Sequence, residues 1–110
     1  MSRRIDPQVS LEAMHKTGPL LAQARAERVY MEEYRKSLKA LLMKASTQSS
    51  AAMQERDAYA DESYVLHLQG LRQAVEREEE LRWKMVTAQT AVEVWRSQES
   101  SARAMDRAAA

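Results

Sequence analysis

The sequence contains no cysteine and no phenylalanine, and beyond Pro19 it contains no further proline and one glycine, Gly70. Proline and glycine are the residues that most reliably interrupt a helix, so their scarcity from Leu20 to Ala110 predicts long helices. The lack of cysteine agrees with a reducing compartment. The same stretch has no glycine-rich phosphate loop and no paired metal motif. The absences therefore indicate a helical protein that acts by binding.

Long apolar runs are also missing. The longest one, residues 40–43, is far too short to span a bilayer, and residues 1–7 lack the apolar segment of a signal peptide. We therefore expect a soluble, cytoplasmic protein with no membrane partner.

The residues that are present favour one fold class. The chain is 45% hydrophobic and 30% charged, and it is rich in Ala, Leu, Met, Glu, Arg and Gln, which are strong helix formers. At 110 residues, we expect a single all-α, coiled-coil-like domain over residues 1–110. Because a rod of two or three helices has a thin core, we expect the chain to form a homo-oligomer.

Polar and turn-forming residues divide the chain into predicted helices. Asp6 and Pro7 suit the N-cap and first position of a helix, and Gly18 followed by Pro19 suits the end of one helix and the start of the next. Residues 46–50 are small and polar and compete with the backbone for hydrogen bonds, so they predict a turn. The predicted helices are residues 7–16, 19–45 and 51–105.

Charge placement favours folding back at that turn. Residues 35–44 carry four basic side chains and no acid, whereas residues 55–62 carry four acids and one base. An antiparallel hairpin about residues 48–50 lays these blocks side by side, which selects topology more than it adds stability. The alternative is one unbroken helix through residues 46–50 in a parallel oligomer, which would stack like charges.

Apolar residues at three- and four-residue spacing indicate the inward sides of the long helices. In the 19–45 helix the stripe is interrupted at Arg28 and consists of Leu21, Ala24, Met31, Tyr34, Leu38, Leu41 and Ala45. In the 51–105 helix it consists of Tyr64, Leu68, Leu71, Val75, Leu81, Met85, Ala88, Val92, Trp95 and Ala102. Glu78 falls near the second stripe; facing inward, it would specify register or meet a base such as Arg28.

The second half of the long helix, residues 81–105, has no partner in this hairpin and carries both tryptophans on two apolar faces. Such a surface is not expected to stay in water. Self-association can cover it, as can the 7–16 helix of the same chain through Ile5, Val9, Leu11 and Met14. The third possibility is another protein, with tryptophan as the anchor. The predicted partner-binding residues are Trp83, Met85, Val92, Val94 and Trp95.

Basic residues in the same half raise a second possibility, a row of contacts to a phosphate backbone. The candidate phosphate-binding residues are Arg82, Lys84, Arg96, Arg103 and Arg107. A row of arginines on a helix is more often a solvated face, and the net charge of +1 is low for a nucleic-acid binder. Nucleic acid is therefore the alternative partner.

No catalytic site is predicted. Glu12 and His15 have the Glu-x-x-His spacing of di-iron bundles, but such a site needs a second copy and further glutamates. His67 has no nucleophile or orienting group that can be assigned to it. We therefore expect no enzyme activity, no metal and no cofactor.

Four segments give the chain a family resemblance: AYAD at 58–61, HLQGL at 67–71, EELRW at 79–83 and EVWRS at 93–97. Over residues 55–107 it resembles the small helical accessory proteins that bacteriophages and prophages encode for recombination and host control. The resemblance implies an accessory factor or inhibitor in the host cytoplasm that binds a protein of DNA metabolism or host defence, here through the C-terminal half of the long helix. The alternatives are a nucleic-acid-binding recombination accessory and a virion scaffold or structural coiled coil.

Overall fold

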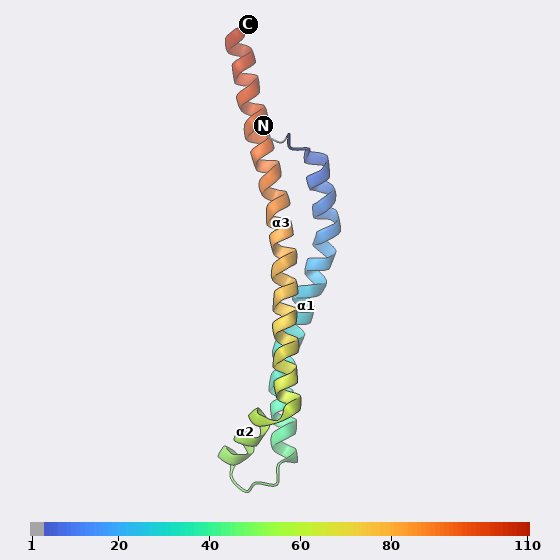
Figure 1. The fold of residues 1–110 in the computed structure, drawn as a ribbon, viewed down its shortest axis with the longest axis vertical. Coiled ribbons are helices and arrows are strands. Elements are labelled where there is room, and N and C mark those ends of the chain that lie inside the picture. Colours follow the sequence, from blue (N-terminus) through green and yellow to red (C-terminus); the bar gives the residue numbers. More distant parts are fainter. Residues whose placement is uncertain (1–3) are drawn as a thin grey trace. The chain divides into compact units, whose positions relative to one another are not determined.

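The computed structural model describes residues 4–110 and is built from helices: α1 (Pro7–Ala45), α2 (Ala51–Ala60) and α3 (Glu62–Ala109) (Figure 1). Residues 4–110 contain no strand, so the predicted all-α class is confirmed. The chain divides into two compact units, which are described separately. Unit 1 contains the chain up to Leu21 together with residues 80–110, and unit 2 contains Ala22–Glu79.

Helix α1 continues through the predicted break, so the expectation of separate helices over 7–16 and 19–45 is wrong. Pro19 lies inside a helix of 39 residues. Proline disfavours the helical conformation of the preceding residue partly through a clash with its Cβ, and Gly18 has no Cβ. Gly18 also lies against α3 within unit 1, since a Cβ placed on it would be 3.7 Å from the Cε of Met85. Packing in unit 1 therefore offsets the local cost of proline, which is about 3 kcal/mol in a helix interior.

The predicted turn at residues 46–50 is confirmed, because α1 ends at Ala45 and α2 begins at Ala51 (Figure 1). Ser50 is the N-cap of α2, and its Oγ accepts a hydrogen bond of 3.2 Å from the amide of Met53. The amide of Gln48 donates to the Oγ of Ser46 at 3.2 Å. Serine hydroxyls thus accept hydrogen bonds from backbone amides that a continuous helix would have paired with backbone carbonyls.

A second break divides the long helix predicted over residues 51–105, and the missed residue is Asp61. Its backbone amide still bonds to Ala58 at 3.3 Å, and its carboxylate accepts from the amide and the Oγ of Ser63 at 2.9 and 2.6 Å. These two hydrogen bonds lower the pKa of Asp61. The carboxylate caps the amide of Ser63 at the start of α3, so one residue ends α2 and begins α3. Helix α3 then runs to Ala109, beyond the predicted end at Met105.

Polar contacts join the helices of unit 2. Glu78 is buried and is hydrogen-bonded to Arg28, as the sequence predicted for an inward Glu78. Lys39 Nζ lies 2.9 Å from Glu55 Oε1, which joins the basic block of α1 to the acidic block of α2. His67 Nε2 lies 2.7 Å from the carbonyl oxygen of Met31.

The inward side of α3 in unit 2 agrees with the predicted stripe at Tyr64 and Leu71 and differs from it at two other positions. Leu68 and Val75 are exposed, and the half-buried positions are His67 and Ala74. On α1, Tyr34, Leu41 and Ala45 are likewise exposed, and Arg28 takes an inward position. The predicted stripe is therefore correct in part, and the seam also contains histidine, alanine and a paired carboxylate, which apolar spacing did not indicate.

Unit 1 has a narrow core made largely of small residues. Leu81 and Ala88 of α3 are buried, as are Ser10 and Thr17 of α1. Met85, Met14 and Leu21 are half-buried. Small side chains let two helices approach closely, but they bury little apolar surface, so this pairing has limited stability of its own.

Candidate functional site

The structure divides the predicted partner-binding residues between two sides of α3 in unit 1. Met85, Val92 and Trp95 are half-buried, on the same side as the buried Ala88. Val94 is exposed, and Trp83 keeps 63% of its surface exposed. Of the residues near the start of the chain that were expected to cover this part of α3, Ile5 and Met14 are half-buried, whereas Val9 and Leu11 are exposed. The start of the chain therefore covers one apolar face of α3 in part, and Trp83 does not belong to that face.

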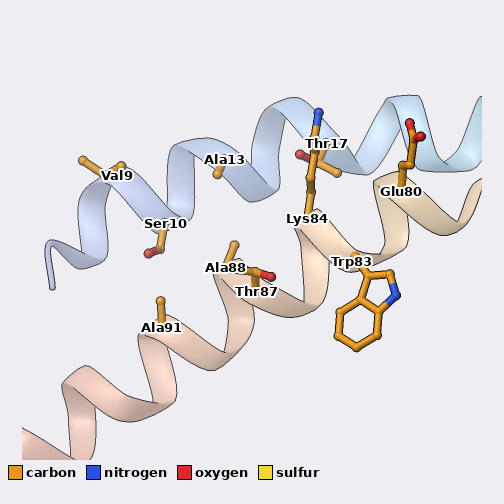
Figure 2. A pocket seen from close by; sticks show the side chains of 10 residues that line it. All are labelled: Val9, Ser10, Ala13, Thr17, Glu80, Trp83, Lys84, Thr87, Ala88 and Ala91. Carbon is orange, nitrogen blue, oxygen red and sulfur yellow. The ribbon is translucent and has the colours of Figure 1, made fainter. Parts of the chain in front are cut away.

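A groove of about 440 Å³ lies between α1 and α3 in unit 1. Its lining is mainly small or apolar and consists of Val9, Ser10, Ala13, Thr17, Glu80, Trp83, Lys84, Thr87, Ala88 and Ala91. Figure 2 shows Ala13 of α1 and Ala88 and Ala91 of α3 directed into the space between the helices. The methyl groups of alanine end short of the opposite helix, and this leaves the groove open.

Two hydroxyl groups lie in the wall of this groove. Ser10 and Thr17 are only 9% and 8% exposed, and within residues 4–110 neither side chain makes a hydrogen bond. No buried side-chain nitrogen or oxygen of residues 4–110 lacks a hydrogen-bond partner, so the hydroxyl oxygens of Ser10 and Thr17 are themselves accessible from the groove. The two hydroxyls are therefore available to a polar group of whatever enters the groove.

The rims of the groove differ in chemistry. Trp83 lies at one edge and points away from α1, while Lys84 and Glu80 extend toward α1 on the other side of α3 (Figure 2). A large aromatic ring beside an apolar floor is the combination that anchors protein interfaces, and charged groups at the rim add selectivity. The arrangement suits an amphipathic segment with one apolar side.

The five candidate phosphate-binding residues do not form one uniform basic surface. All five are exposed, but Lys84 lines the groove and Arg96 Nη1 lies 3.2 Å from Glu93 Oε1. Arg96 and Arg103 share a shallow hollow with the carboxylates of Glu93 and Glu99. Acidic neighbours weaken attraction for a polyanion, so the nucleic-acid expectation for this region gains no support from the geometry.

A polar cluster occupies the seam of unit 2. Glu78 accepts from Arg28 and Arg25, and Arg28 also donates to Glu32 at 3.0 Å. Arg28 is the main cause of a lowered pKa at Glu78, whose burial acts in the opposite direction. Hydrogen bonds to Glu78 and Glu32 raise the pKa of Arg28 above its ordinary value. All the acids of this cluster are matched by arginines, so its evident role is to fix the pairing of the helices.

Two further features were not anticipated from the sequence. The groove in unit 1 depends on alanines at matching positions of two distant segments, and no local pattern marks such a match. A hollow in unit 2 is lined by Arg35, Lys36, Lys39, Tyr59 and Tyr64. The sequence feature that could have indicated this hollow is the basic block over residues 35–44, which contains no acidic residue.

Comparison with models of protein families, with curated proteins and with solved structures finds no match to this chain. Within residues 4–110, no helix has both the length and the apolar character needed to cross a membrane. In the same residues, no group of three or more His, Asp and Glu side chains is placed to hold a metal ion. The argument for function therefore depends on the surfaces described above.

Proposed function

We propose that this chain is a non-enzymatic accessory protein that binds an amphipathic helix of a partner protein in the groove of unit 1. The observation that carries this proposal is an open groove with an alanine-rich floor and an exposed tryptophan at its rim. A third helix could place large apolar side chains over the small ones, which is how helices dock in apolar grooves. Ser10 and Thr17 would supply hydrogen bonds to it.

The scaffold for this activity is an antiparallel helical hairpin. In unit 2, Arg28 meets Glu78, Met31 meets His67 and Lys39 meets Glu55, so later residues of α1 meet earlier residues of α3 and α2. In unit 1, Gly18 approaches Met85. Within each unit, this order of contacts is the one that a hairpin produces.

The partner class comes from the resemblance to bacteriophage accessory proteins. It suggests a protein of DNA metabolism or host defence in the host cytoplasm, and the lack of cysteine agrees with that compartment. The competing occupant is a second copy of this chain, because a helical surface with an exposed tryptophan also suits self-association. The experiment must distinguish these occupants.

Site-specific photo-crosslinking provides the test. A photoreactive side chain at Thr87 lies in the groove, and the same group at the exposed Gln73 of α3 is the control. We expect cross-links from Thr87, and none from Gln73, to a helical segment of one partner protein. Cross-links from Thr87 to this chain alone would assign the groove to self-association, and their absence would overturn the proposal.

A binding measurement with that purified segment gives the energetic test. Trp83→Ala should weaken binding by about 2 kcal/mol, or about 30-fold in Kd, as expected for an interface anchor. Ala91→Glu should abolish binding by placing a charge in the groove. Ala102→Glu, the same change at an exposed position of α3, is the matched control and should bind like the wild type.

A further inference from the structure

The hollow in unit 2 lies where three helices meet. Arg35, Lys36 and Lys39 of α1, Tyr59 of α2 and Tyr64 of α3 enclose about 310 Å³. It exists because Asp61 interrupts the helix between the two tyrosines. Their rings make an edge-to-face contact with centroids 5.2 Å apart, so the break holds an aromatic wall opposite three cations.

The aromatic wall is anchored on one side and open on the other. Tyr64 is buried, while Tyr59 is exposed, and the Nζ of Lys39 lies 4.8 Å from the centroid of the Tyr59 ring. The same Nζ lies 2.9 Å from Glu55 Oε1. Lys39 is thus held at a defined position over one face of the Tyr59 ring, and Tyr59 remains 44% exposed.

The cations of the hollow are unequally neutralised. Lys39 pairs with Glu55, and Lys36 lies 3.3 Å from Glu33, in a pair whose members are both well exposed. Arg35 makes no ion pair or hydrogen bond with any residue of the described chain, 4–110. Exposed pairs are weak, so Lys36 can turn to another anion at small cost. Arg35 and Lys36 therefore leave unmatched positive charge next to the aromatic wall.

We infer that this junction hollow binds a nucleotide through its terminal phosphate. The guanidinium of Arg35 can donate two parallel hydrogen bonds to phosphate oxygens, and Lys36 supplies a second positive charge. The exposed ring of Tyr59 offers a surface for a base, which favours a nucleotide over inorganic phosphate. A volume at the lower end of the range for ligand pockets suits one nucleotide and excludes a large cofactor.

The free nucleotide and the 5′ end of a nucleic-acid strand share this chemistry. The lining of the hollow does not include Arg96, Arg103 or Arg107, so the inferred site is separate from the candidate phosphate-binding residues of unit 1. It is also independent of the groove between α1 and α3, because its residues all belong to unit 2.

The test is a titration of the full-length protein, followed by the NMR signals of its backbone amides. Adenosine monophosphate should shift the amides around residues 35–39 and 59–64 in a saturable way, whereas adenosine and inorganic phosphate should bind at least about tenfold more weakly. Equal binding of inorganic phosphate, or no saturation with the nucleotide at millimolar concentrations, would overturn the inference.

Variants locate the site and identify the source of the phosphate. Arg35→Gln should weaken nucleotide binding about tenfold or more without lowering the unfolding temperature, since Arg35 is exposed and unpaired. The matched control, Arg103→Gln, should change nothing. A 5′-phosphorylated oligonucleotide that binds more tightly than the mononucleotide would identify a strand end as the ligand. Equal binding of its unphosphorylated form, or equal effects of the two variants, would contradict the assignment.

Discussion

In unit 2 ion pairs join the helices beside the buried Ala24, Ala58 and Tyr64, whereas in unit 1 the helices meet through small and apolar side chains and the hydroxyl residues Ser10 and Thr17. Arg28 with Glu78 and Lys39 with Glu55 join the helices of unit 2, while Leu81, Ala88 and the Gly18 contact mark the core of unit 1. Directional polar contacts select one register for the paired helices. The small residues of unit 1 instead leave a groove between the helices.

The largest effect should come from breaking the apolar core of unit 1. Leu81 is 6% exposed, so Leu81→Ala should lower the free energy of unfolding by about 2–4 kcal/mol through lost burial and a cavity. Leu66 lies on the same helix but is 56% exposed, and Leu66→Ala should cost less than about 1 kcal/mol. Urea unfolding followed by circular dichroism measures both. Equal losses would show that the core of unit 1 is not where the structure places it.

A smaller effect should follow from removing the charge of the polar seam in unit 2. Glu78→Gln weakens the hydrogen bonds from Arg28 and Arg25, and we expect a loss of about 1.5–3 kcal/mol at neutral pH. Glu27→Gln, an exposed change in α1, is the control and should cost little. Chemical unfolding at pH 7 is the measurement.

Acid should act on the same seam. Since the folded-state pKa of Glu78 is below its ordinary value of 4.5, the unfolded chain takes up a proton first as the pH falls. The stabilisation is therefore complete above that ordinary value and is lost as the pH falls through the lowered pKa. Wild type and Glu27→Gln should lose more unfolding free energy between pH 7 and pH 3 than Glu78→Gln does. An identical loss in all three proteins would mean that protonation of Glu78 does not contribute to the loss of stability in acid.

The smallest effects sharpen the comparison at the two glycines. Gly18→Ala in unit 1 should lower the free energy of unfolding by up to about 1 kcal/mol, because a Cβ on this helical residue would clash with Pro19, although it would make an ordinary contact with Met85. In unit 2, a Cβ on Gly70 would lie 2.9 Å from the Cε of Met31, so that methyl group must move. Because the end of the Met31 side chain is flexible, Gly70→Ala should still raise the free energy of unfolding by up to about 0.5–1 kcal/mol. Thermal unfolding compares the two variants, and a more stable Gly18→Ala would show that a Cβ at residue 18 does not clash with Pro19.

Local sequence signals predicted the helical class and the break at residues 46–50 because helix propensity and serine capping act over a few residues. They failed where distant contacts outweighed propensity, as at Pro19. They also missed Asp61, although aspartate is a good N-cap, because no glycine or proline stands beside it. For the candidate site, the sequence pattern placed Trp83 on an apolar face and Ala88 on the inward stripe, but nothing in the sequence marked Ala13 or Ala91 as groove residues.

The sequence by itself determined that this chain is helical, where its main turn lies and that Glu78 facing inward would need a base such as Arg28. Only the tertiary structure decided that α1 continues through Pro19, that His67 and Ala74 replace Leu68 and Val75 on the inward side, and which residues line the groove and the junction hollow. The physical reason is range: capping and propensity are set by neighbours in the chain, whereas packing and charge pairing depend on residues about fifty positions apart, such as Arg28 and Glu78.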